Sequence, residues 1–308
     1  MSLRSLKLPT IDFINKRKYA MVLSAFLLIV SVISLSLQGL KLGIDFTGGT
    51  LIEVGYQQTA DLEDIRTKLA SASYMGANVQ YFGSDTEILI QLEPQAISSA
   101  KLSSSIIQML GDGIDVRRVE FVGPKVGEEL TNDGGLALLY ALIGILIYVA
   151  FRFEYRFALG SITALIHDVI ITLGVFSILQ IAFDLTVLAA ILAVIGYSLN
   201  DTIVVFDRIR ENFLSTRHIE PVPIVNDALN QTLARTLMTS LTTLLVLLAL
   251  FYLGGEVIHS FAGALIIGVV IGTYSSIFVA SSMILALGIS KEDMLPSEKE
   301  KKEIDARP

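Results

Sequence analysis

The sequence predicts a polytopic α-helical membrane protein with six transmembrane helices and one α+β domain between the first and second helices. Mean hydropathy is +0.65 and 53% of the residues are hydrophobic, which is too apolar for a soluble domain. Six runs almost free of charge are each close to or above the roughly 20 residues that span a bilayer. They cover residues 19–40, 134–151, 157–183, 185–200, 236–255 and 260–290.

The distribution of basic residues predicts the topology. The first run follows Lys16-Arg17-Lys18 and is too long for a signal peptide, so we expect an uncleaved anchor. Lys and Arg also gather between helices 2 and 3, between helices 4 and 5 and after helix 6, whereas the turns after helices 3 and 5 have none. By the positive-inside rule, both termini (1–18 and 291–308) and the 207–235 loop are cytoplasmic. We expect the charged tail to be disordered.

The polar stretch 41–133 alternates between strand and helix patterns and forms the outside domain. Strands are expected at 50–56, 78–82, 87–92 and 116–122, and helices at 59–73 and 96–110. This β-α-β-β-α-β order is that of a ferredoxin-like split βαβ unit, which by itself decides no function. In the cytoplasmic stretch we expect a surface helix at 207–216, a turn broken by prolines and a helix that runs into span 5.

Two glycine-rich segments join the outside domain to the membrane. The first contains Gly43, Asp45 and the pair Gly48-Gly49, and the second contains Gly123-Pro124. The glycines permit tight turns, and the first segment lacks the lysine and spacing of a phosphate loop. We interpret both segments as structural turns that act as hinges.

Three ionisable residues lie in or beside the apolar runs: Asp168, Asp201 and Arg235. A charge at mid-membrane costs about 2.5–3.5 kcal/mol on insertion scales, and such residues commonly handle protons or ions. Tyr197, Ser198 and Asp201 fall within about 100° on a helix, so this stripe must face protein or water. Two plain alternatives stay open: Asp201 marks a helix end, and Arg235 is an anchor that snorkels to the inner surface.

The pair His167-Asp168 interrupts the third run near its middle and is a further candidate for a proton relay. A lone buried histidine is more often a hydrogen-bonded structural residue than a proton carrier. Arg235 shares one face of span 5 with Gln231, Thr239 and Thr242, and it could pair with Asp201 across adjacent helices.

A stripe of small residues at a spacing of four predicts close helix packing in span 6, against another span or another protein. Its members are Ala264, Gly268, Gly272, Ser276 and Ala280. Cysteine is absent, which excludes disulfides, thiolate metal sites and thiol catalysis. No nucleophile–base pair or metal cluster is visible outside the membrane, so we expect neither an enzyme nor a cofactor or metal.

Together these segments resemble the SecF family, the smaller subunit of the SecDF component of bacterial protein secretion. The matching pieces are GIDFTGGT at 43–50, GPKVGEEL at 123–130, the HD of span 3, GYSLNDTIVVFDRIREN at 196–212 and QTLARTLMTS at 231–240 with the stripe that follows. They cover nearly the whole chain in the right order. The family belongs to the superfamily of the proton-driven RND exporters.

The resemblance implies a multi-pass protein of the bacterial inner membrane whose outside domain is periplasmic. It implies a complex with SecD, association with the SecYEG channel and with YajC, and contact with lipid and with a translocating polypeptide, but not with nucleic acid. It implies that the proton-motive force drives late steps of translocation and that Asp201 and Arg235 are the functional pair, with a further carboxylate in SecD. An RND-type solute exporter, or a scaffold that uses no protons, is the alternative.

Overall fold

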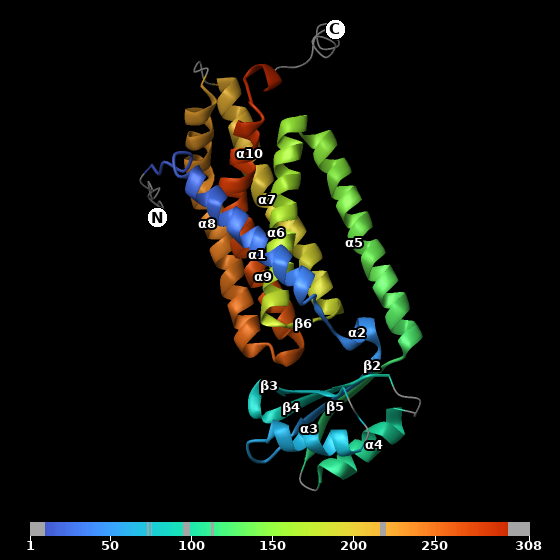
Figure 1. The fold of residues 1–308 in the computed structure, drawn as a ribbon. Helices are drawn as coiled ribbons and strands as arrows, with labels where there is room; N and C mark the ends of the chain where they lie inside the picture. Colours follow the sequence, from blue (N-terminus) through green and yellow to red (C-terminus); the bar gives the residue numbers. More distant parts are fainter. Residues whose placement is uncertain are drawn as a thin grey trace, which may run out of the picture.

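Six long apolar helices form the membrane part of the computed structural model, which describes residues 10–72, 74, 76–94, 99–111, 114–215 and 220–294 (Figure 1). Each is long and apolar enough to cross a bilayer, so the predicted number of spans is matched among these residues. The spans are α1 (Arg17–Leu37), α5 (Pro124–Arg152), α6 (Tyr155–Leu179), α7 (Leu185–Ser215), α8 (Pro221–Leu253) and a last span of α9 (Glu256–Ser275), a π-helix (Ser276–Ala280) and α10 (Ser281–Ala286).

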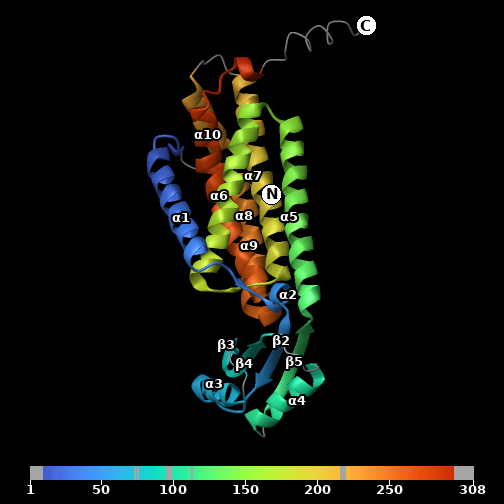
Figure 2. The same ribbon diagram turned by 45° about the vertical axis from the view of Figure 1, so that its right-hand side comes forward.

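Helix α7 lies at the centre of the bundle. It packs against α6, α8 and α9, while α1 packs on the outer side of α6. The most apolar window of α7 is 56% buried, whereas that of α5 is only 11% buried. Figure 2 shows α5 along one side of the bundle. Its exposed apolar side chains suit contact with lipid, while the polar groups of α7 are enclosed by protein.

The half of the bundle that lies away from the sheet has an aromatic core. Phe157 of α6 and Phe206 of α7 are almost fully buried, with ring centroids 4.8 Å apart, and Phe153 packs edge-on against Phe206. This core extends along α7 to Ile209 and Phe213, which are also fully buried. Large buried side chains pack the end of α7 tightly against its neighbours. This half of the bundle is therefore rigid.

The extramembrane domain is a four-stranded antiparallel sheet with two helices on one face. Its elements are β2 (Gly49–Gly55), α3 (Leu62–Ser71), β3 (Asn78–Phe82), β4 (Ser84–Leu92), α4 (Ser99–Leu110) and β5 (Asp115–Val122), in the strand order β3-β4-β2-β5. All three neighbouring pairs are antiparallel. Alternate residues such as Ile52, Val54, Ile88 and Ile90 are fully buried beneath the helices, as a half-covered sheet requires.

A short neck joins the domain to the bundle. It consists of β1 (Lys41–Leu42), the helical turn α2 (Ile44–Thr47) and the first residues of α5. Strand β1 pairs in parallel with β6 (Ala182–Phe183), in the connection between α6 and α7. Neither this two-residue ladder nor α2 is predicted from the sequence, because such short elements carry no periodicity.

Two helices extend beyond the ranges predicted for them. Helix α5 begins at Pro124, well before residue 134, because Gly123 and Pro124 form a favourable helix start and the polar turns that follow are helical too. No separate surface helix begins at Asp207; α7 continues to Ser215 because Ile209 and Phe213 keep its core-facing stripe apolar. The predicted disorder of the tail falls largely on residues 295–308, outside the described residues.

Candidate functional site

Asp201 lies on α7, sixteen residues after Leu185, and therefore about 24 Å along the helix from its first residue. Its side chain is only 3% exposed. Among the residues that the structure describes, its Oδ2 atom has no hydrogen-bond partner. A buried carboxylate oxygen without a partner is rare and costly, so it needs an explanation other than packing.

Arg235 lies on α8 and is exposed in the isolated chain. It lies on the helix that packs beside α7, and it forms no direct ion pair with Asp201 among the described residues. The polar face that it shares with Gln231, Thr239 and Thr242 is exposed as well. Arg235 is thus a cation on the neighbouring helix that does not neutralise Asp201 by direct contact among the described residues.

The pair His167-Asp168 occupies the centre of a separate, fully hydrogen-bonded network. Asp168 is 1% exposed; its Oδ2 accepts from Ser198 of α7 at 2.5 Å and from Ser275 of α9 at 2.7 Å. Its Oδ1 lies 2.8 Å from Nδ1 of His167. Three spans therefore meet at this one carboxylate.

The same network extends to α1. The Nε2 atom of His167 lies 3.1 Å from the hydroxyl of Ser24, which lies 3.0 Å from the hydroxyl of Tyr274. Tyr274 in turn donates to the backbone carbonyl of Ala20 at 2.6 Å. The sequence alone did not predict Ser24, Tyr274 and Ser275 as members of this network. Single hydroxyl residues in an apolar run indicate buried polar contacts. Their spacing along one helix does not reveal which residues of other helices they contact.

A second polar chain links α7 to α8 and α9. Tyr197 donates to Ser240 of α8 at 3.2 Å, and Ser240 lies 2.7 Å from the hydroxyl of Thr273 on α9. The predicted stripe of Tyr197, Ser198 and Asp201 is therefore divided. Tyr197 and Ser198 have partners within the chain, and Asp201 retains an unpartnered oxygen among the described residues.

The small residues of span 6 lie against α7. A Cβ atom at Gly268 would overlap the side chain of Val194, and one at Gly272 would lie 3.1 Å from Cβ of Ser198. Ala264 and Ser276 are fully buried, and Ser276 begins the π-helix. This close approach brings Ser198 and Ser275 near enough to share Asp168.

The glycine-rich segments meet each other in the neck. Gly48 and Gly49 have φ values of +69° and +130°, which favour glycine. A Cβ at Gly48 would lie 3.0 Å from Cα of Pro124, and one at Gly127 would lie 2.8 Å from the Gly48 nitrogen. The two chain passages into the domain thus form one packed junction, and Gly123 adopts ordinary extended backbone at the start of α5.

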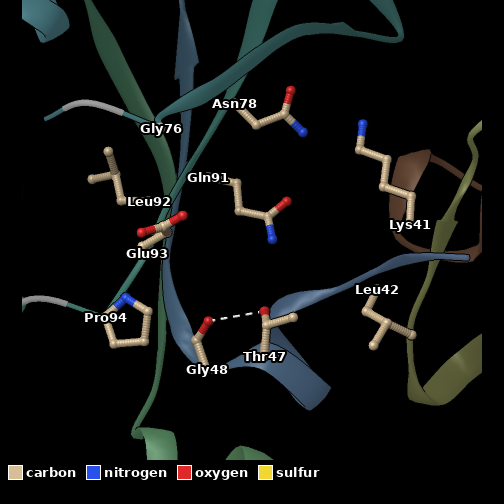
Figure 3. Close-up of a pocket in the computed structure, with 10 residues that line it drawn as sticks. All are labelled: Lys41, Leu42, Thr47, Gly48, Gly76, Asn78, Gln91, Leu92, Glu93 and Pro94. Carbon is tan, nitrogen blue, oxygen red and sulfur yellow. Dashed lines mark hydrogen bonds between the residues drawn. The ribbon is translucent and has the colours of Figure 1, made fainter. Parts of the chain in front are cut away.

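Lys41 links the neck to the sheet. Its ammonium group donates to Gln80 of β3 at 2.8 Å, and burial lowers the pKa of that ammonium group. Lys41, Thr47 and Gly48 line a cavity of about 400 Å³ together with Gln91 and Glu93 of the domain (Figure 3). Among the described residues no cluster of metal ligands is found.

Fold and site together define a polytopic membrane protein with ionisable groups enclosed by its helices and an α+β domain outside them. The sequence matches the family Protein export membrane protein SecD/SecF, C-terminal, over residues 103–290, and the SecD/SecF GG Motif over residues 33–60. The chain belongs to the SecF family. It is therefore a multi-pass membrane component of Sec protein transport.

Two curated relatives carry the description Protein translocase subunit SecF. The relative from Vibrio alginolyticus is 54% identical, with 97% of each chain covered, and that from Pseudomonas aeruginosa is 46% identical, with 99% of this chain and 100% of the relative covered. The crystal structure of SecDF, a translocon-associated membrane protein from Thermus thermophilus, superposes with a TM-score of 0.85 at 38% identity over 92% of this chain. The chain spans only 39% of that polypeptide.

Proposed function

We propose that this chain is the SecF-type subunit of a SecDF complex that uses the proton-motive force to promote late steps of SecYEG-dependent protein translocation. Asp201 is the proton-binding group and Arg235 is the cation that governs it. The observation that carries the proposal is the buried Oδ2 of Asp201, which has no hydrogen-bond partner among the described residues, on a helix that packs against the one carrying Arg235.

An unpartnered carboxylate suits reversible protonation. Enclosure by apolar groups favours the neutral carboxyl form, and approach of a guanidinium group favours the carboxylate. A change in the separation of Asp201 and Arg235 would therefore load or release one proton. The membrane potential contributes about 2.3 kcal/mol per charge per 100 mV, which is enough to bias a two-state rearrangement.

The exposed polar face of α8 supports the proposal that a partner chain binds there. Charged and polar groups within a bilayer rarely face lipid, yet Arg235, Thr239 and Thr242 are exposed in this chain alone. We propose that SecD covers this face and supplies the further carboxylate of the proton path. SecYEG, YajC, the translocating polypeptide and lipid complete the proposed set of partners. The proton gradient is the energy source, so the proposal needs no cofactor or metal.

We further propose that the protein lies in the bacterial inner membrane with both termini in the cytoplasm and a ferredoxin-like domain in the periplasm. Arg152 ends α5, Arg156 lies in the first turn of α6, and Arg208 and Arg210 lie in the last turns of α7. These helix ends lie at the end of the bundle opposite the sheet (Figure 1). This arrangement supports cytoplasmic placement of that end by the positive-inside rule. The β-α-β-β-α-β order and the strand order support the ferredoxin-like assignment.

The decisive variant is Asp201→Asn, which preserves the shape of the side chain and removes its titrating group. We expect normal expression and SecD binding, together with loss of the component of translocation that a proton gradient stimulates. Translocation is measured in membrane vesicles with and without the gradient. Gradient-stimulated translocation that survives intact in Asp201→Asn would contradict the proton role and favour a scaffold. Gradient-driven export of a small solute would favour the RND-type exporter.

A further inference from the structure

The neck contacts the first turn of α7, the helix that carries Asp201. The Oδ2 atom of Asp45 in α2 accepts a hydrogen bond from the backbone nitrogen of Leu185 at 3.0 Å. Leu185 is the first residue of α7, where backbone N–H groups have no partner within the helix. A carboxylate at this position is also favoured by the helix dipole. Asp45 therefore caps a helix that begins 140 residues later in the sequence.

The contact of Asp45 belongs to a wider junction with the connection between α6 and α7. The Gly43 nitrogen donates to the Phe183 carbonyl at 2.8 Å, which extends the ladder between β1 and β6. The rings of Phe46 and Phe183 stack with their centroids 5.8 Å apart. A Cβ atom at Gly43 would lie 3.2 Å from Cβ of Asp184, so a side chain there would crowd the junction. Neck and connection thus form one packed unit.

The other side of the neck leads directly into the sheet. Strand β2 begins at Gly49, four residues after Asp45, and it is one of the two inner strands. A Cβ atom at Gly49 would overlap the Leu92 carbonyl oxygen. Thr131 of α5 donates to the Phe46 carbonyl at 3.3 Å, so the neck is held from the α5 side too. Because only three residues lie between Asp45 and β2, we expect a tilt of the domain to displace Asp45.

Space for such a tilt lies between the sheet and the bundle. A cavity of about 610 Å³ separates residues of the open sheet face, among them Leu89 and Glu120, from the ends of α6, α7 and α9. Asp45 and Leu185 line the same cavity. The domain therefore adjoins the bundle across open space and is attached to it through the neck.

From these contacts we infer that Asp45 is a positioning residue that fastens the neck to α7, so that movement of the extramembrane domain shifts the helix carrying Asp201. Helix α7 is continuous from Leu185 to Ser215 and contains no proline, so a shift of its first turn is transmitted along its axis. This inference rests on the proposed function, because it supplies the mechanical link between the proton site and the domain.

The plain alternative is that Asp45 is an ordinary helix cap, and the chain contains a matched control for it. Asp184 accepts from the Val187 nitrogen at 2.8 Å and from the Thr186 hydroxyl at 2.7 Å. It therefore caps the same end of α7 but lies in the connection that leads into this helix, outside the neck. Loss of Asp184 weakens the cap and leaves the hydrogen bond between neck and helix in place, whereas loss of Asp45 weakens the cap and also removes that hydrogen bond.

The test measures translocation in vesicles that contain the complete complex. We expect Asp45→Ala to reduce the gradient-stimulated component about tenfold, the factor that corresponds to one charge-assisted hydrogen bond. Asp45→Asn retains an acceptor oxygen and should preserve most of that component. Asp184→Ala should remain close to wild type. Equal losses in Asp45→Ala and Asp184→Ala, or full activity in Asp45→Ala, would overturn the inference.

A second measurement keeps the inference separate from the proposed function. Because the chain has no cysteine, spin labels can be attached at Ser84 in the sheet and Ser215 at the far end of α7, with Ser84→Cys and Ser215→Cys as the only thiols in the chain. The distance distribution between the labels should broaden in Asp45→Ala and remain narrow in Asp184→Ala and Asp45→Asn. An unchanged distribution in Asp45→Ala would refute the link, even where Asp201→Asn abolishes gradient-stimulated translocation. Intact translocation in Asp201→Asn would instead refute the proton role.

Discussion

Two carboxylates lie buried among the membrane helices, and their surroundings differ. Asp168 and Asp201 are 1% and 3% exposed, so burial does not distinguish them. Both oxygens of Asp168 have hydrogen-bond partners, contributed by His167, Ser198 and Ser275. Among the described residues, Oδ2 of Asp201 has none. The difference between the two lies in hydrogen bonding.

This difference separates a structural role from a functional one. The Asp168 carboxylate, whose hydrogen bonds are complete, connects α6, α7 and α9. Its removal would leave its donors without a hydrogen-bond partner in an apolar interior. A carboxylate with an open oxygen contributes little to the fold and remains available to a proton or a partner chain. We therefore assign the His167-Asp168 pair to the architecture of the bundle and keep Asp201 as the proposed proton site.

Loss of the Asp168 carboxylate is expected to have the largest effect on stability. Asp168→Ala leaves Ser198, Ser275 and His167 without their acceptor, and removal of one member of a buried charged network typically costs about 3–5 kcal/mol. The measurement is the thermal unfolding midpoint of the purified protein in detergent. Asp201→Ala is the matched control and should change the midpoint little. A comparable fall in both variants would remove the distinction between the two sites.

The contact of α9 with α7 should have the next largest effect. Gly268→Leu forces a side chain into the space that Val194 occupies, and overpacking of this kind costs about 1–3 kcal/mol. The expected result is a lower unfolding midpoint. A Cβ atom at Gly144 on α5 would meet no other atom within 4 Å, so Gly144→Leu is the control. Equal midpoints for Gly268→Leu and wild type would show that this crossing does not assemble the Asp168 network.

Much of the architecture could be predicted from the sequence, because apolar length and strand periodicity are local properties. The predicted range for β3 agrees with the observed Asn78–Phe82. The Asp201 and Arg235 candidates were found because charges are conspicuous in apolar runs. The partners of Asp168 were not found, because Ser198 and Ser275 come from helices whose contacts no single-helix pattern specifies. The neck contact of Asp45 was missed for the same reason.

Ser198→Ala should have a smaller effect and tests whether the two sites communicate. It removes one of the donors to Asp168, and a typical cost is about 1 kcal/mol. The unfolding midpoint should fall slightly while gradient-stimulated translocation stays near wild type. Ser198 lies only three residues before Asp201 on α7. A loss of gradient stimulation without any change in the midpoint would show that Asp168 also sets the position of Asp201.

Arg235 should affect stability least and transport strongly, which makes it the sharpest test of the comparison. Its side chain is exposed in this chain, and surface substitutions usually change stability by less than about 0.5 kcal/mol. Arg235→Ala should nevertheless abolish gradient-stimulated translocation, because the proposed proton site loses the cation proposed to govern Asp201. Arg235→Lys keeps the charge but loses the planar guanidinium fork, so we expect partial activity. Unfolding midpoints and translocation in vesicles are measured on the same variants. If Arg235→Ala transports normally with a gradient, proton binding at Asp201 does not depend on Arg235. The absence of a partner for Oδ2 of Asp201 among the described residues would then need another explanation.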